Sequence, residues 1–143
     1  MNKIYISLFM ALALSLFALW KSNEQKEKEP FCVTYHVAIH TISLHKTLIT
    51  YTDSQGLVQE IFKDRHWSKT VSLPPDGIAS LYVEELIEAG EIPYSIIEPQ
   101  DSVSKELGNK PISIWIEHEK KIVLNAGGGQ LRVSLLPSEV NGN

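Results

Sequence analysis

The sequence is poor in cysteine and in positive charge, and each shortage excludes a class of protein. Cys32 is the only cysteine, so no disulfide can form within one chain and the fold must be stabilised by packing. Lysine and arginine total 13 against 17 acidic residues, which gives a net charge of −4. Because no basic stripe is present to neutralise phosphates, we expect no nucleic-acid partner.

Charge and proline are also missing from residues 4–20, where only Ser7 and Ser15 are polar. A run of this length is close to the lower limit of about 17–25 residues for a membrane-spanning helix. A soluble helix normally carries a polar stripe, which this run lacks. We therefore expect residues 1–21 to form a transmembrane anchor or signal segment, followed by a charged tether at residues 22–30.

The sidedness of this anchor is not fixed by charge alone, because Lys3 precedes the apolar run and Lys21 follows it. The short N-terminal region with one lysine is typical of an export signal. We expect a single-pass cell-membrane protein with an extracytoplasmic globular domain, and cleaved secretion is the alternative. The globular domain is predicted at residues 31–137, with a disordered tail at residues 138–143.

Beyond residue 30 the apolar residues alternate with polar ones, as in half-buried strands. Asp53 and Gly56 predict a tight hairpin turn between two of these strands. We expect strand through about Val83, one helical turn at residues 84–89, and a short strand at residues 94–97. The remaining strands are predicted at residues 33–41, 48–52, 57–62, 67–73, 112–117, 121–125 and 130–136. Short strands at this spacing indicate an all-β sandwich or small barrel.

Three motifs carry a family resemblance: Tyr51-Thr52-Asp53 in a hairpin ending in glycine, Trp67-Ser68-Lys69-Thr70 in a strand, and a late hairpin with Lys121 before its return strand. With them the chain resembles the MmpS-type small membrane-protein family. The resemblance implies an immunoglobulin-like antiparallel β-sandwich preceded by one N-terminal transmembrane helix. It also implies an accessory subunit that assists a resistance-nodulation-division type exporter of lipids or siderophores.

Two other functions are compatible with the sequence. One is a secreted or surface β-sandwich protein with a small-molecule-binding or hydrolytic role, and the other is a structural envelope protein. We expect no enzyme, because no Gly-x-Ser-x-Gly elbow is present and Cys32 has no assigned base. The glycine run at residues 127–129 precedes a strand, so it predicts a flexible loop or bulge and no phosphate site.

The histidines and tryptophans are the remaining candidates for chemistry. His36 and His40 share a strand face but stand about 13 Å apart, too far to chelate one zinc ion without other ligands, and we expect no metal or cofactor. Trp67 is predicted to be buried in the sandwich. Trp115 and Glu117 lie opposite the isoleucine face of their strand, so we predict that they form an interaction surface unless the polar loop at residues 99–110 covers the tryptophan.

Overall fold

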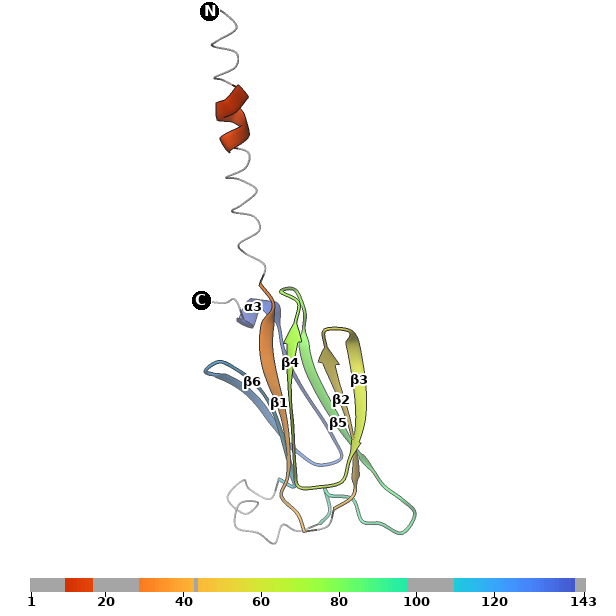
Figure 1. Ribbon diagram of the computed structural model, residues 1–143. Helices are drawn as coiled ribbons and strands as arrows, with labels where there is room; N and C mark the ends of the chain where they lie inside the picture. Colours follow the sequence, from red (N-terminus) through yellow and green to blue (C-terminus); the bar gives the residue numbers. More distant parts are fainter. Residues whose placement is uncertain (1–9, 17–28, 43, 98–109, 141–143) are drawn as a thin grey trace, which may run out of the picture.

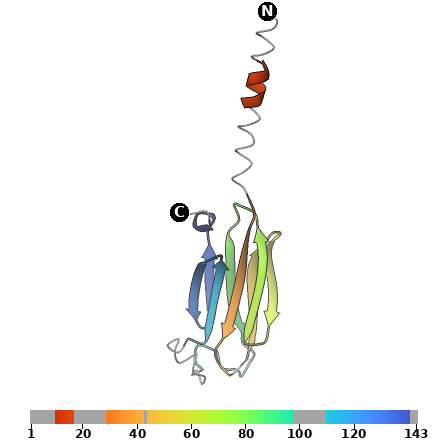
Figure 2. The same ribbon diagram turned by 60° about the vertical axis from the view of Figure 1, so that its left-hand side comes forward.

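The computed structural model describes residues 10–16, 29–42, 44–97 and 110–140, and the eight strands within them form two four-stranded antiparallel sheets. Sheet A has the order β4-β1-β6-β7 and sheet B the order β3-β2-β5-β8. The strands are β1 (Phe31–Ile39), β2 (Lys46–Asp53), β3 (Gly56–Phe62), β4 (His66–Leu73), β5 (Ala79–Leu86), β6 (Ile112–His118), β7 (Lys121–Gly127) and β8 (Gln130–Leu135). The two sheets pack face to face along one long axis (Figures 1 and 2). The predicted all-β sandwich is confirmed.

Alternating burial builds the core between the sheets. In β1 the inward residues are almost fully buried, and the side chains between them reach the outer face. The same holds for β5 and β8. The central core residues, each no more than 1% exposed, are Val33, Tyr35, Val37, Ile49, Leu73, Ala79, Leu81, Val83, Ile112, Ile114, Ile116 and Leu135. Because side chains on a strand alternate with period two, this core follows directly from the apolar spacing of the sequence.

The hairpin between β2 and β3 has the chemistry that the sequence predicts. Asp53 Oδ1 accepts a hydrogen bond from the backbone N–H of Gln55 at 2.7 Å. Gly56 has φ +123°, a conformation that L side chains rarely adopt. Asp53 and Gly56 face each other as the last register pair of the two strands. The predicted turn is therefore confirmed, and it fixes the register of β2 against β3.

Two local predictions between residues 84 and 97 are wrong. The helical turn expected at residues 84–89 is absent, because β5 continues as a strand to Leu86 and pairs with β2 and β8. The strand expected at residues 94–97 is instead a turn, in which the backbone N–H groups of Ile96 and Ile97 bond the carbonyl of Pro93. At residues 84–86 the alternating burial of β5 continues, whereas at residues 94–97 a buried polar cluster, described below, holds the chain in the turn.

Three consecutive glycines lie at the end of β7 and in its turn to β8, and a side chain would meet a different obstacle at each. Gly129 has φ +79°. A Cβ on Gly128 would lie 2.8 Å from both Cα and Cβ of Ser95, whereas a Cβ on Gly127 would meet only the end of the Leu131 side chain, at 3.0 Å. The β7–β8 turn therefore packs directly against the backbone of the loop that contains Ser95. The predicted flexible loop is a close-packed turn.

A first prediction follows from this packing. Gly128→Ala is expected to lower the free energy of unfolding by about 1–3 kcal/mol, because backbone must move to make room for the methyl group. Gly127→Ala is the matched control and should cost less, since only the flexible end of Leu131 must give way. Urea denaturation of both variants measures the difference. Equal losses would show that the contact with Ser95 does not restrict the turn.

The two ends of the chain bear on the anchor and tail predictions. Residues 10–16 form a helix with exposed Met10, Leu12, Leu14 and Leu16, and the rest of the predicted anchor and the tether up to residue 28 lie outside the described residues. Within the part of the chain that the structure describes, no helix is long and apolar enough to cross a membrane. The predicted sandwich ends at residue 137 and the predicted disordered tail follows it, but residues 137–140 form one helical turn, α3 (Pro137–Val140). Residues 141–143 of the tail lie outside the described residues.

Candidate functional site

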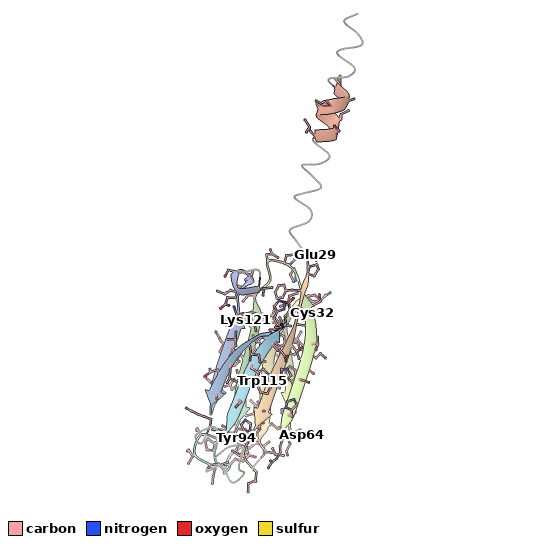
Figure 3. The ribbon with its side chains drawn as sticks, turned by 90° about the vertical axis from the view of Figure 1, so that its left-hand side faces the viewer. Glu29, Cys32, Asp64, Tyr94, Trp115 and Lys121 are labelled. Atoms are coloured by element: carbon pink, nitrogen blue, oxygen red, sulfur yellow. The ribbon has the colours of Figure 1, made fainter. Side chains whose placement is uncertain are left out.

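The predicted interaction surface lies on the outer face of sheet A. Trp115 is near the middle of β6 (Figure 3), and its ring stacks on the imidazole of His36 with centroids 4.7 Å apart and an angle of 8° between the rings. His36 and Trp115 are register partners across β1 and β6, which places both side chains on the same face. Trp115 is partly exposed. Of the loop at residues 99–110 that is its predicted alternative cover, residues 99–109 lie outside the described residues.

Glu117 joins the same cluster through His36. Its Oε2 lies 3.1 Å from Nε2 of His36, whose side chain is 17% exposed against 45% for the glutamate. His36 is thus held between an aromatic ring and a carboxylate. The structure brings Trp115 and Glu117, the two predicted residues, together on one imidazole that orients both of them.

Aliphatic side chains from β7 extend the cluster toward the edge of the sheet. Leu124 is the register partner of Trp115, and Ile122 is the partner of Glu117. Each of these two side chains is 60% exposed. We call the set His36, Trp115, Glu117, Ile122 and Leu124 the Trp115 face. It combines an oriented aromatic ring with exposed aliphatic groups and one carboxylate, which is the composition of a protein contact surface.

His40 and His66 lie beside the Trp115 face, whereas His118 packs against the Phe31 ring at the end of β6. His66 on β4 lies 6.0 Å from the His36 ring, and His40 Nε2 is 2.9 Å from the Ser113 hydroxyl. His118 Nδ1 lies 2.8 Å from the carbonyl oxygen of Cys32. Among the residues described here, no group of three or more His, Cys, Asp or Glu side chains could hold a metal ion.

A second polar cluster lies buried at the end of the sandwich where Tyr94 is labelled in Figure 3. Glu85, on the inward side of β5, has a fully buried side chain, and its Oε1 lies 2.6 Å from Nδ1 of His45. The same oxygen accepts the backbone N–H of Tyr94 at 2.6 Å. His45 also lies near an exposed acid, with Nε2 3.8 Å from Oε2 of Glu91. We call Glu85, His45 and Tyr94 the buried triad.

Tyr94 completes the buried triad from the side of the loop. Its ring is fully buried and stacks on His45 with centroids 4.6 Å apart. Its hydroxyl bonds both the backbone N–H and the carbonyl of His45. Burial raises the pKa of the Tyr94 phenol, so the neutral hydroxyl is the form that makes these bonds. The triad therefore fastens residues 87–97 to the end of the sandwich, and this role explains why a carboxylate stands at a core position.

The remaining predicted residues lie where the strand pattern puts them. Trp67 faces inward opposite Val37 but is only partly buried, and its ring lies 5.4 Å from that of Tyr51. Burial, with the Glu60 carboxylate as a second cause, raises the pKa of Tyr51 to about 12. Cys32 is an exposed free thiol. These contacts pack the open edge between β3 and β4 and add no further group to the Trp115 face.

Sequence reasoning did not place His36 beside Trp115 and Glu117, and it missed the buried triad altogether. The sequence does place His36 on the polar face of its strand, but only the register of β1 against β6 shows that it meets Trp115. For the triad, one signal was available. Glu85 continues the inward series Ala79, Leu81 and Val83, and an acid at a core-facing position requires a buried partner.

No protein-family model matches the chain, and no match is found among curated proteins. The resemblance to the MmpS-type family therefore stays a prediction from its three motifs.

Proposed function

We propose that this protein is a membrane-anchored, extracytoplasmic accessory module that binds a larger envelope protein through the Trp115 face. The observation that carries the proposal is the grouping of an oriented tryptophan with two exposed aliphatic residues, Ile122 and Leu124, on one sheet face. Tryptophan is enriched among the residues that dominate binding energy at protein interfaces. The partner surface that fits it has an apolar groove and a hydrogen-bond donor opposite Glu117.

The proposal includes an immunoglobulin-like topology. In immunoglobulin domains strand B pairs with E in one sheet and C with F in the other. The pairs β1–β4 and β2–β5 follow that scheme, with β3 beside β2 in the position of the additional strand C′. The β6–β7 hairpin takes the place beside β1 where strand A lies in those domains. Four of the five residues of the Trp115 face, all except His36, thus lie on the part of this chain that departs from the immunoglobulin order.

The proposed partner is an exporter of the resistance-nodulation-division type that carries lipids or siderophores, as the family resemblance implies. A membrane-anchored module of this kind binds and positions its partner and performs no catalysis. Its support is the apolar run at residues 4–20 together with the three shared motifs. A role as a structural envelope protein would need no tryptophan grouped with exposed aliphatic side chains on one face.

Site-specific photocrosslinking in native membranes tests this function. A photoreactive residue at position 124, on the Trp115 face, is expected to capture one larger membrane protein. The same residue at position 61 is the matched control, because Ile61 is 66% exposed but lies on the edge strand of sheet B. Absence of an adduct at position 124, or equal capture at both positions, would refute the proposal.

Trp115→Ala provides a quantitative version of this test. We expect it to weaken partner binding at least about 30-fold, as for residues whose truncation costs about 2 kcal/mol or more. Trp115→Phe keeps a ring that can stack on His36, so it should lose less affinity for the partner than Trp115→Ala does. Co-purification from detergent extracts measures both variants, with thermal unfolding as the check on folding. Unchanged recovery of the partner with a folded Trp115→Ala protein would exclude this face as the interface.

A further inference from the structure

A hollow on the opposite side of the sandwich has the features of a small-molecule site. It lies on the outer face of sheet B, has a volume of about 250 Å³, and is lined by Thr50, Leu57, Ser80, Tyr82 and Arg132. Thr50, Tyr82 and Arg132 form one row of register partners across β2, β5 and β8. We call it the Arg132 hollow. It shares no residue with the Trp115 face or with the buried triad.

The guanidinium of Arg132 is the charged group of the hollow. Its Cζ lies 5.2 Å from the centre of the Tyr82 ring, which orients it over the strand. None of the ion pairs formed among the described residues includes Arg132. The acid nearest along the register, Glu84, accepts a hydrogen bond from Nε2 of Gln130 at 3.2 Å. A guanidinium presents five N–H donors, so this one has donors to offer to a ligand.

The hollow is also lined by the hydroxyl-bearing residues Thr50 and Ser80 on the same face. The hydroxyls of Thr52 and Ser80 are 2.6 Å apart, and Nε2 of Gln59 donates to the Thr50 hydroxyl at 3.4 Å. A hydroxyl can donate one hydrogen bond and accept others. Arginine beside such donors recognises the oxygen atoms of a carboxylate or phosphate. The polar part of the hollow therefore fits a compact oxyanion.

The remaining wall is apolar. Leu57 is 73% exposed, the highest value among the exposed large hydrophobic side chains of the described residues, and it borders the hollow together with the Tyr82 ring. An isolated anion would leave this apolar surface unused. The hollow is also smaller than the roughly 300–1,000 Å³ typical of sites for drug-sized ligands. A small ligand, or one end of a longer one, fits it.

We propose that the Arg132 hollow binds the anionic head of a small amphiphile, a carboxylate or phosphate carried on a short apolar chain. The oxyanion accepts hydrogen bonds from the Arg132 guanidinium and from the hydroxyls of Thr50 and Ser80. The first carbon atoms of the chain pack against Leu57 and the Tyr82 ring. The proposal is independent of partner binding at the Trp115 face, because the two surfaces belong to different sheets.

Calorimetric titration of the full chain in phosphatidylcholine nanodiscs tests this site, with empty nanodiscs as the blank. Hexyl phosphate and hexanoate are expected to bind, and hexanol and inorganic phosphate to bind at least about tenfold more weakly, since each lacks one half of the contacts. The two alkyl anions distinguish a phosphate head from a carboxylate head, and binding of either one supports the site. Binding of hexanol or inorganic phosphate as tight as that of both alkyl anions would overturn the proposal, as would heats equal to those of empty nanodiscs.

Variants assign the binding to the hollow. Arg132→Gln is expected to weaken hexyl phosphate binding tenfold or more, because a charged hydrogen bond is lost. Arg132→Lys keeps the charge but loses the planar guanidinium donors, so its affinity should lie between those of the wild type and Arg132→Gln. Leu57→Ser should weaken the binding of hexyl phosphate but leave the weaker binding of inorganic phosphate unchanged. Lys69→Gln removes an exposed cation on sheet A and is the matched control. Equal affinity of the wild type and Arg132→Gln would refute the site, whatever the crosslinking at position 124 shows.

Discussion

Replacing Glu85 with alanine is expected to lower the free energy of unfolding by about 2–5 kcal/mol, because it leaves two buried polar groups without their partner at about 1–3 kcal/mol each. The glutamate side chain is fully buried, and its Oε1 contacts both the His45 imidazole and the backbone N–H of Tyr94. Alanine leaves both groups inside the protein without this acceptor. Urea denaturation monitored by circular dichroism measures the loss through the shift in midpoint.

Two further variants separate the causes of that loss. Glu84→Ala is the matched control, because Glu84 is the neighbouring acid on the opposite, outer face of β5, and a change within about 0.5 kcal/mol is expected there. Glu85→Gln keeps an oxygen acceptor but removes the charge, so its cost should lie between those of the other two. A loss below 1 kcal/mol for Glu85→Ala would show that the buried triad does not hold residues 87–97 to the sandwich.

The core of the sandwich was predictable because its signal is local. Apolar residues at every second position of β1 and β6 identify the inward faces, and the structure buries Val33, Tyr35, Ile112, Ile114 and Ile116 accordingly. The β2–β3 hairpin was equally local, since its turn chemistry lies within four residues. In each case the side-chain period or the turn residues suffice, and no knowledge of distant partners is needed.

The functional clusters were not predictable in the same way, because they depend on pairs far apart in sequence. His36 meets Glu117 across 81 positions, and His45 meets Glu85 across 40. Nothing in either local sequence fixes which strand becomes the neighbour. The prediction of a helical turn at residues 84–89 fails for the same reason, since a strand with Glu85 on its buried side is favourable only once His45 and Tyr94 contact that carboxylate.

Trp115 shows how far a local pattern can lead toward a site. Its position opposite the isoleucine face indicates that it points away from the core, and the structure places it there, partly exposed. Its stacking on His36 and its aliphatic neighbours on β7 come only from the register of three strands. The pattern of one strand thus predicts which way a side chain points, whereas predicting which residues share a surface requires the pairing of the strands in the sheet.

The second large effect is expected at the centre of the core. Ile114→Ala should lower the free energy of unfolding by about 2–5 kcal/mol, because a fully buried isoleucine leaves both lost burial and a cavity. Ile114 is 0% exposed on β6, between the register partners Val37 on β1 and Asn125 on β7. Denaturant unfolding of the purified variant measures the change.

Leu124→Ala on the neighbouring strand is the informative control, since it also truncates an aliphatic side chain of sheet A to alanine. Leu124 is 60% exposed, so its loss should change the unfolding free energy by only about 0.5 kcal/mol or less. If the Trp115 face binds a partner, this stable variant should nevertheless reduce partner recovery, whereas any residual folded Ile114→Ala protein should bind normally. Stability and binding would then be controlled by opposite faces of the same sheet. A large destabilisation by Leu124→Ala would instead mean that β7 is buried in the folded protein, and the Trp115 face could not serve as a contact surface.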